Sequence, residues 1–284
     1  MKKFAVIDIG SNSVRLMLWA NGKTLYKKIK TTRLGAGLAD KRLLGADAIE
    51  RSVAAICDFQ AEAKGYPVYA FATAAVRSAE NRSDFCACVK SVCGLSVDVV
   101  SGEAEALLGL NGALGRRDGG VVDIGGASTE VCVRDGGKIV FSESIPLGAV
   151  RLYDLCRDDP VKLEHATESA LNKLRGCTIN GELYAVGGTA ATLAGLKCAM
   201  QIYDGQKLHR TVLSADETER TAENLLRMKP EERAKLAGME KGREDIIAGG
   251  AYLFSKVLKV LSVDKAYFSD ADNLEGYLVY RGLI

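Results

Sequence analysis

Apolar and polar positions along this 284-residue chain change their spacing several times. Residues 6–9 and 121–124 are apolar runs of valine and isoleucine, each interrupted by one aspartate, and such runs are typical of buried strands. A tight turn follows each run, and a second strand is predicted at 16–20 or at 131–134. Asn21-Gly22 and the 135–137 Asp-Gly-Gly segment then indicate hairpins. Each half of the chain is therefore predicted to open as an antiparallel meander.

These two openings are similar to each other in sequence. Residues 6–13 read VIDIGSNS, and 115 positions later residues 121–128 read VVDIGGAS. An internal repeat constrains the architecture more strongly than any single motif does. The chain is therefore predicted to consist of two related halves.

Helical spacing dominates between and after these openings. A polar break rich in glycine at 116–120 separates the halves. Helices are predicted around 49–59, 83–92, 103–114, 149–157, 161–175, 189–198, 215–227 and 244–261. Further strands are predicted at 68–72, 96–100, 182–186 and 265–269. Both halves are thus predicted to be α/β, and a chain of this length favours two domains with a cleft between them.

Composition and charge narrow the class of protein. Hydrophobic residues make up 48% and charged residues 26%, which is ordinary for a globular protein. The formal net charge of +2 is too small for a surface that coats nucleic acid or anchors on a membrane. No window is long enough to span a bilayer, and Asp8 interrupts the only early apolar run, so a cytoplasmic protein is expected.

The eight cysteines are expected to be reduced thiols, because the chain shows no secretion signal. We therefore expect no disulfide. Cys86, Cys88 and Cys93 form the only cluster, but they lack the paired spacing of a zinc site. Packing in a core explains them better than a metal does.

The turns that follow the buried strands predict phosphate chemistry. Glycines let backbone N–H groups approach an anion closely, and serine or threonine hydroxyls add donors, at 10–13 and at 125–129. A carboxylate beside phosphate is repelled unless a divalent cation lies between them, so Asp8 and Asp123 suggest Mg²⁺ or Mn²⁺. The 187–189 Gly-Gly-Thr turn opens a predicted helix and is a third candidate anion site.

Several ordered motifs resemble those of the Ppx/GppA phosphatases, the exopolyphosphatases and guanosine pentaphosphate phosphohydrolases. The two glycine turns resemble the family's phosphate motifs, and the resemblance covers nearly the whole chain. Further matching segments are 72–81 with Arg77, 101–106 with Glu105, 147–152, 187–190 and 203–209.

The resemblance implies two ribonuclease-H-like domains of the actin-like ATPase superfamily, with the active cleft between them. The expected domains are residues 1–118 and 119–271, with a C-terminal helix at 272–284 that packs back on the first. The chain resembles short family members without an extra helical domain. Dimerisation is common in the family, so a homodimer is one expected form.

The resemblance also implies roles for individual residues. Glu105, rather than Glu103, is the expected catalytic base, although both glutamates also suit a solvated helix start. Arg77 and Arg15 would supply positive charge, unless each forms only a surface salt bridge. The expected catalytic residues are Glu105, Asp123, Glu130 and Arg77, and the expected metal ligands are Asp8, Asp123 and Glu130. The expected phosphate-binding residues are Gly10, Ser11, Asn12, Ser13, Arg15, Gly125, Gly126, Ala127, Ser128, Thr129, Gly187, Gly188 and Thr189.

Two positions depart from the family pattern. Ala127 replaces a glycine, which is tolerated only if this residue avoids positive φ. In the closing segment, Asn273 or Leu274 stands where the family has an arginine. This departure bears on the choice of substrate.

The expected activity is release of orthophosphate from the ends of inorganic polyphosphate. The alternatives are a guanosine pentaphosphate 5'-phosphohydrolase and a non-catalytic sensor of guanosine tetra- or pentaphosphate. A kinase or ATPase of the same fold is a further alternative, with its nucleotide against Gly187 and Gly188.

Overall fold

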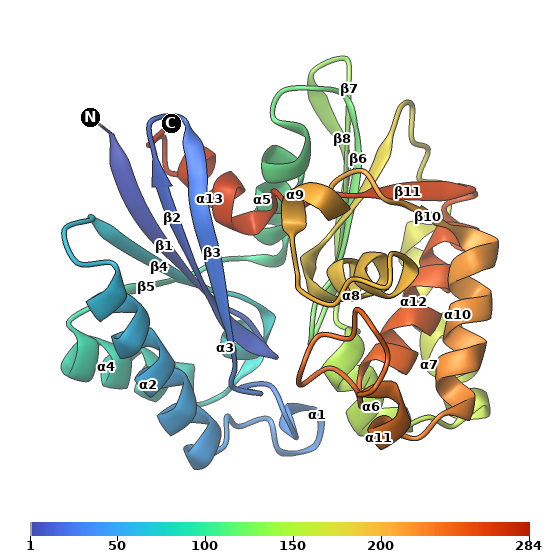
Figure 1. The fold of residues 1–284 in the computed structure, drawn as a ribbon, viewed down its shortest axis with the longest axis horizontal. Coiled ribbons are helices and arrows are strands. Elements are labelled where there is room, and N and C mark those ends of the chain that lie inside the picture. The colour runs from blue at the N-terminus through green and yellow to red at the C-terminus, as the bar shows by residue number, and fades with distance from the viewer. Residues whose placement is uncertain (1) are drawn as a thin grey trace.

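Two mixed sheets flanked by helices form the molecule in a computed structural model that describes residues 2–284 (Figure 1). The first sheet has the order β3-β2-β1-β4-β5, and the second has the order β10-β11-β9-β6-β7-β8. In each sheet the first three strands along the chain pair antiparallel. The later strands β4, β5, β9 and β11 join in parallel after helical crossovers. The edge strand β10 is the exception, because it pairs antiparallel with β11. The predicted pair of ribonuclease-H-like α/β folds is confirmed.

The strands and helices agree closely with the predicted periodicity. The strands are β1 Lys3–Ile9, β2 Ser13–Ala20, β3 Lys23–Thr31, β4 Val68–Ala72, β5 Val97–Val99, β6 Gly119–Ile124, β7 Thr129–Asp135, β8 Lys138–Ile145, β9 Leu183–Val186, β10 Val212–Ser214 and β11 Lys265–Phe268. The helices are α1 Leu38–Lys41, α2 Ala46–Glu62, α3 Ala74–Ser78, α4 Arg82–Cys93, α5 Gly102–Leu114, α6 Ala149–Cys156, α7 Pro160–Leu171, α8 Gly187–Lys197, α9 Gly205–Leu208, α10 Ala215–Arg227, α11 Pro230–Arg233, α12 Ile247–Val260 and α13 Asn273–Tyr280. The short elements α1, α3, α9, α11 and β10 were not predicted, because three to five residues carry too little periodicity to be recognised.

Each sheet has its own core. In the first half, α2 and α4 cover one face of the sheet, where the buried residues include Ile7, Leu16 and Phe59 (Figure 1). In the second half, α7, α10 and α12 lie on the outer side of the larger sheet, around Val122 and Phe254. The two cores are separate, although α5, which precedes β6 in the chain, packs against β6 and β7 of the second sheet.

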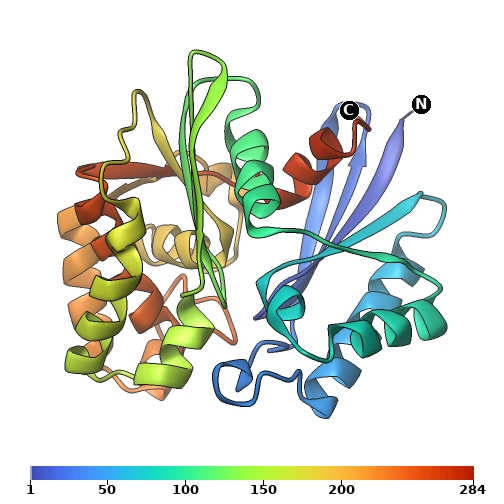
Figure 2. The same ribbon diagram turned by 180° about the vertical axis from the view of Figure 1, so that it is seen from behind.

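The last helix, α13, returns from the second sheet to the first half. It packs against α5 and β1, with Leu274, Tyr277 and Leu278 buried beside Val6 and Phe71 of the first sheet (Figure 2). Two glycines allow the close contact with α5. A Cβ on Gly112 would lie 1.9 Å from the carbonyl oxygen of Asp272, and one on Gly276 would lie 1.9 Å from that of Leu108. The start of α13 is thereby held at the junction of the two halves.

The expectation that all cysteines are reduced is wrong for one pair. Cys57 in α2 and Cys93 in α4 form a disulfide, with Cα atoms 5.5 Å apart. α2 and α4 pack against each other, which brings the two thiols together. Cys86 and Cys88 are partly buried against the same core. Every helix among residues 2–284 is too short or too polar to span a bilayer.

Candidate active site

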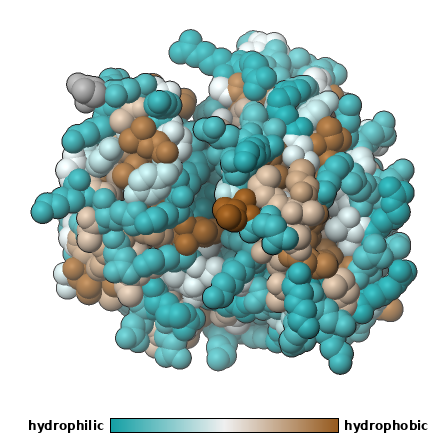
Figure 3. Space-filling model, in the orientation of Figure 1, coloured by the Kyte–Doolittle hydropathy of each residue, from teal (hydrophilic) through white to brown (hydrophobic). Residues whose placement is uncertain are grey.

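A cleft with a cavity volume of about 280 Å³ lies between the two sheets. The space-filling view shows the molecule hollowed there, with both hydrophilic and hydrophobic residues around the hollow (Figure 3). Segments from both halves meet in it, among them the β1–β2 turn, the β6–β7 turn, the first turns of α5, α8 and α13, and residues 238–243. Strand ends and helix starts converge at this point, which is where α/β folds generally bind ligands.

The two glycine turns face each other across the cleft. Each turn is closed by the same bond, from the Gly10 N–H to the Ser13 carbonyl and from the Gly125 N–H to the Ser128 carbonyl, both at 3.0 Å. A Cβ on Gly126 would lie 2.6 Å from the Cβ of Ser11, so the turns are nearly in contact. Ala127 is not among the described residues with positive φ, which agrees with the condition set for it above. Backbone donors from both halves therefore converge on one small volume.

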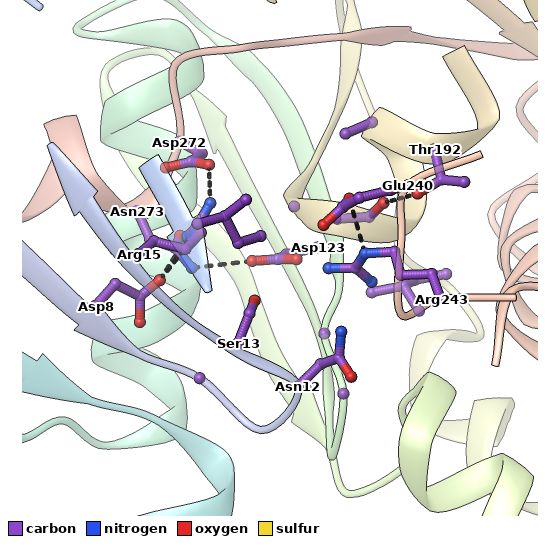
Figure 4. Close-up of a pocket in the computed structure, with 18 of the residues that line it drawn as sticks. Asp8, Asn12, Ser13, Arg15, Asp123, Thr192, Glu240, Arg243, Asp272 and Asn273 are labelled. Atoms are coloured by element: carbon purple, nitrogen blue, oxygen red, sulfur yellow. Dashed lines mark hydrogen bonds and ion pairs between the residues drawn. The ribbon is translucent and has the colours of Figure 1, made fainter. Parts of the chain in front are cut away.

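Around the first turn, the charges are paired. The Arg15 guanidinium donates to Asp8 at 3.0 Å through Nε, and it also forms an ion pair with Asp272 at the start of α13 (Figure 4). Burial opposes the charge on Arg15, but Asp272 and Asp8 outweigh it and hold the pKa of Arg15 well above its usual value. Burial also opposes ionisation of Asp272, yet Arg15 and Lys27 keep the pKa of Asp272 below its usual range. The Arg15 guanidinium is therefore already paired with carboxylates of the protein.

Around the second turn, no described cation forms an ion pair with Asp123, and Glu130 has only the Arg77 Nη2, at 3.9 Å. Asp123 lies opposite Glu130 across β6 and β7, and both are buried. Asp123 accepts a hydrogen bond of 2.9 Å from the Asn273 amide, and Glu130 accepts one of 2.7 Å from Ser144. Burial raises the pKa of Asp123 to about 6. Burial, followed by the charges of Glu105 and Asp123, raises the pKa of Glu130 well above its usual value.

Glu105 lies in the first turn of α5, at the cleft, whereas Glu103 is exposed. The Arg77 Nη1 donates to Glu105 at 2.7 Å and to the Val100 carbonyl at 3.0 Å. Burial raises the pKa of Glu105 to about 7, against the lowering effect of Arg77. A buried carboxylate with a pKa near neutrality can accept a proton at physiological pH, as a general base requires.

Most of the expected site residues come together in this cleft. Those that line it are Asp8, Gly10, Ser11, Asn12, Ser13, Arg15, Glu105, Asp123, Gly125, Gly126, Ala127, Ser128, Gly187 and Gly188. Arg77 and Glu130 lie just behind this lining, where the Arg77 Nη2 is 3.9 Å from Glu130. Thr129 and Thr189 are buried, and their hydroxyls donate to the carbonyls of Leu147 and Ile124. We therefore assign no phosphate contact to these two hydroxyls.

The structure adds cleft residues that the sequence analysis did not assign to chemistry. Asp272 and Asn273 reach Arg15 and Asp123 from the start of α13, and Arg243 lines the opposite side. The sequence did contain an indication of the place of Asp272, because an aspartate with Glu275 three residues later is the pattern of a capping box, and this box starts α13. No local pattern indicated Arg243.

The carboxylates of the cleft suit a magnesium ion that is shared with substrate. Asp8 Oδ1 and Glu130 Oε2 are buried oxygens without a hydrogen-bond partner, and one oxygen of each of these carboxylates is already held by the protein. Among residues 2–284, no three His, Cys, Asp or Glu side chains converge closely enough to hold a metal alone. Mg²⁺ is commonly held by one or two carboxylates together with waters and substrate phosphates, so this donor set fits it.

The chain is similar in sequence to an exopolyphosphatase and to a pyrophosphatase. It is 30% identical to Exopolyphosphatase 2 of Mycobacterium tuberculosis over 312 aligned positions, which cover 97% of both proteins. It is 34% identical to the guanosine-5'-triphosphate,3'-diphosphate pyrophosphatase of Vibrio cholerae, over 52% of this chain and 32% of that protein.

The fold is also shared with a solved structure. The crystal structure of the Aquifex aeolicus member of the Ppx/GppA protein family has a TM-score of 0.79 at 30% identity, covering 99% of this chain and 98% of that one. The model of the Ppx/GppA phosphatase family matches residues 6–281. With nearly the whole chain matched in both sequence and fold, this protein belongs to the Ppx/GppA phosphatase family.

Proposed function

We propose that the protein is an exopolyphosphatase that hydrolyses the terminal phosphoanhydride bond of inorganic polyphosphate and releases orthophosphate. The observation that carries this proposal is the cleft in which two facing glycine turns lie beside a buried Glu105 held by Arg77. The turns offer backbone donors to phosphate oxygens, and Glu105 offers a base for water. This combination suits hydrolysis better than it suits binding alone.

In this mechanism, the turns hold the terminal phosphoryl group and Glu105 orients a water molecule in line with its phosphorus. The water oxygen bonds to phosphorus, the bridging P–O bond breaks, and Glu105 accepts the proton from the water. The electron pair of the broken bond stays on the shortened chain, and orthophosphate leaves. Arg77 stabilises the carboxylate of Glu105 in its ionised form, and its guanidinium lies beside the site where negative charge develops.

Asp8, Asp123 and Glu130 would hold Mg²⁺ or Mn²⁺ together with substrate oxygens. The ion supplies charge neutralisation for the phosphoryl oxygens when it is bound. Ser144 and Asn273 orient two of these carboxylates through the hydrogen bonds described above.

A second candidate substrate is guanosine pentaphosphate, hydrolysed at its 5' end. The similarity to the Vibrio cholerae pyrophosphatase favours this candidate, and the same bond type would be cut in both substrates. A sensor without activity is disfavoured, since it would not need a buried base with a pKa of about 7. A kinase would need an acceptor for the phosphoryl group, and an ATPase would need ATP. The assay below contains neither, so it distinguishes both from the proposed hydrolase.

The two halves, residues 1–118 with 272–284 and residues 119–271, would act as two domains that enclose the substrate. A cytoplasmic location and a homodimer remain predictions.

The decisive test compares Glu105→Gln with Glu103→Gln. Both changes remove a carboxylate from the first turn of α5, but only Glu105 faces the cleft. Phosphate release from polyphosphate and from guanosine pentaphosphate, with Mg²⁺ and no acceptor, should fall by about 10²–10⁴-fold in Glu105→Gln. It should stay within about twofold of the native rate in Glu103→Gln. Equal losses in both variants, or no release by the native protein from either substrate, would contradict the proposal.

A further inference from the structure

The start of α13 contacts two cations of the first sheet. Asp272 and Glu275 are the two side chains of the capping box that begins this helix. Asp272 also forms an ion pair with Arg15, and Glu275 forms one with Lys27 at 2.9 Å. Figure 4 shows the Arg15 side chain between Asp8 and Asp272. The residues that start the helix therefore also neutralise charges of the cleft.

These two cations lie in a row that leads away from the first glycine turn. Arg15 and Lys27 both line the cleft. Arg15 comes two residues after Ser13 in β2, and Lys27 of β3 pairs with Met17, two residues further on. Side chains two residues apart in a strand point to the same face, about 7 Å from each other along the strand. Without their carboxylate partners, the two cations would offer a track to a polyanion that extends beyond the turn.

The charge balance of the cleft does not suit a long polyanion. The other two cations that line it are also paired, Lys28 with Glu62 at 2.6 Å and Arg243 with Glu240 at 2.8 Å. Carboxylates outnumber lysines and arginines among the described lining residues. A groove that binds a polyanion along its length normally has a surplus of positive charge. Attraction of phosphate in this cleft therefore depends mainly on the backbone donors of the glycine turns.

Asp272 adds a second carboxylate to a guanidinium that already has one. Arg15 lies opposite Asp8 in the strand register and donates to it at 3.0 Å. When both carboxylates are ionised, the group of three side chains carries one net negative charge, which opposes the approach of a polyanion. The cap of α13 does not require this charge, because asparagine caps a helix as well as aspartate does. The charge of Asp272 therefore bears on the cleft rather than on the start of the helix.

We propose that Asp272 is a specificity-determining residue that withholds Arg15 from the substrate and limits binding to the few phosphates held at the glycine turns. The substrate class is then short-chain polyphosphate, and a longer chain gains no affinity from its additional phosphates. This inference rests on the proposed function, because it takes the terminal phosphate to lie at the turns. Removal of the charge on Asp272 should increase the affinity for a long chain. Loss of a merely structural contact would not produce a change in that direction.

The test compares Asp272→Asn with Asp159→Asn as the matched control. Both aspartates cap a helix through their side chains, and asparagine preserves such a cap, but Asp159 at the start of α7 is not among the residues that line the cleft. KM per chain end is measured for tripolyphosphate and for long-chain polyphosphate. For Asp272→Asn, KM for the long chain should fall by about tenfold or more, with kcat and the KM for tripolyphosphate within about threefold of the native values. Asp159→Asn should match the native protein.

Two kinetic outcomes would overturn the inference. One is an unchanged KM for the long chain in Asp272→Asn, in a preparation that melts as a folded protein. The other is an equal fall in KM for tripolyphosphate and for the long chain, which would mean that Asp272 does not discriminate between chain lengths.

A second measurement depends neither on hydrolysis nor on the folding of a variant. Binding of tripolyphosphate and of long-chain polyphosphate to the native protein is compared by calorimetry without metal, and the two affinities per chain end should agree within about threefold. A long chain that binds about tenfold more tightly than tripolyphosphate would overturn the inference, because cations beyond the turns would then be available to it. In Asp272→Asn, the long chain should bind about tenfold more tightly than to the native protein at low ionic strength, and salt at about 0.5 M should remove most of this gain. These results would support the inference even if neither protein released phosphate, whereas equal binding by both proteins at low ionic strength, or binding by neither, would overturn it.

Discussion

The two hairpins that open the halves share one backbone plan but differ in their charges. In the first, Asp8 lies opposite Arg15 across β1 and β2, and in the second, Asp123 lies opposite Glu130 across β6 and β7. The two pairs occupy equivalent positions in the repeat. A cation in one hairpin has thus been replaced by an anion in the other.

This difference separates a stabilising hairpin from a reactive one. In the first hairpin, the Arg15 guanidinium donates to Asp8 and forms an ion pair with Asp272 of α13, although burial still raises the pKa of Asp8. In the second, two buried carboxylates face each other, and their raised pKa values show that ionising both is unfavourable. A cation and an anionic substrate would relieve this repulsion. The unfavourable charges therefore lie where the chemistry is proposed.

The largest expected effect is on stability, in the first hairpin. Arg15→Leu removes the guanidinium from two buried carboxylates, Asp8 and Asp272, and we expect the free energy of unfolding to fall by about 3–5 kcal/mol. The equivalent change in the second hairpin, Glu130→Gln, removes a repelled charge and should leave stability equal or higher. Urea denaturation of both variants measures the contrast, and equal losses would contradict it.

The next effect is on activity, in the second hairpin. Asp123→Asn keeps the shape of the side chain but removes a carboxylate from the proposed metal and phosphate site. We expect kcat for polyphosphate to fall by about 100-fold or more, which corresponds to about 3 kcal/mol of transition-state stabilisation. Stability at pH 7 should not decrease. A variant that loses stability and activity together would indicate that Asp123 serves the fold instead.

The pH dependence of stability should also differ between the native protein and Asp123→Asn. The pKa of Asp123 is about 6 in the folded protein and 3.8 as the reference value, so the folded state binds more protons between these pH values. This group's contribution to stability is present at low pH and is lost as pH rises through about 6. The native protein should lose about 2–3 kcal/mol across this window relative to the variant. Parallel curves from urea denaturation between pH 4 and pH 7 would contradict this assignment.

The smallest effect concerns Arg77, whose charge lowers the pKa of Glu105. The value of kcat/KM for the native protein should decline below about pH 7, as the free enzyme's base becomes protonated. Arg77→Gln removes the lowering effect, so this acid limb should move upward by about one pH unit, whatever happens to the maximal rate. A pH profile of each protein measures the limb. An unchanged limb would indicate that Glu105 is not the titrating base.

Several features could be predicted from the sequence because each depends on residues that are close together in the chain. The repeat at 6–13 and 121–128, the long helices and the turns all carry local signals, and the structure has them where they were predicted. The pairing of Arg15 was not visible. Its partner Asp272 is 257 residues away, and the sequence analysis placed Arg15 on phosphate. Nothing near Arg243 in the sequence indicates which of its nitrogens would be free.

The sequence by itself determined the α/β class, the duplication and the residue types available for phosphate chemistry, since periodicity, turn residues and motifs act over short distances. Only the tertiary structure decided which of those charges are paired. The folding of α13 back onto the first half brings Asp272 to Arg15 and Asn273 to Asp123, while the segment before α12 brings Arg243 to α8. Burial then sets the protonation of Glu105, Asp123 and Glu130, because desolvation depends on everything packed around a carboxylate rather than on its neighbours in the chain.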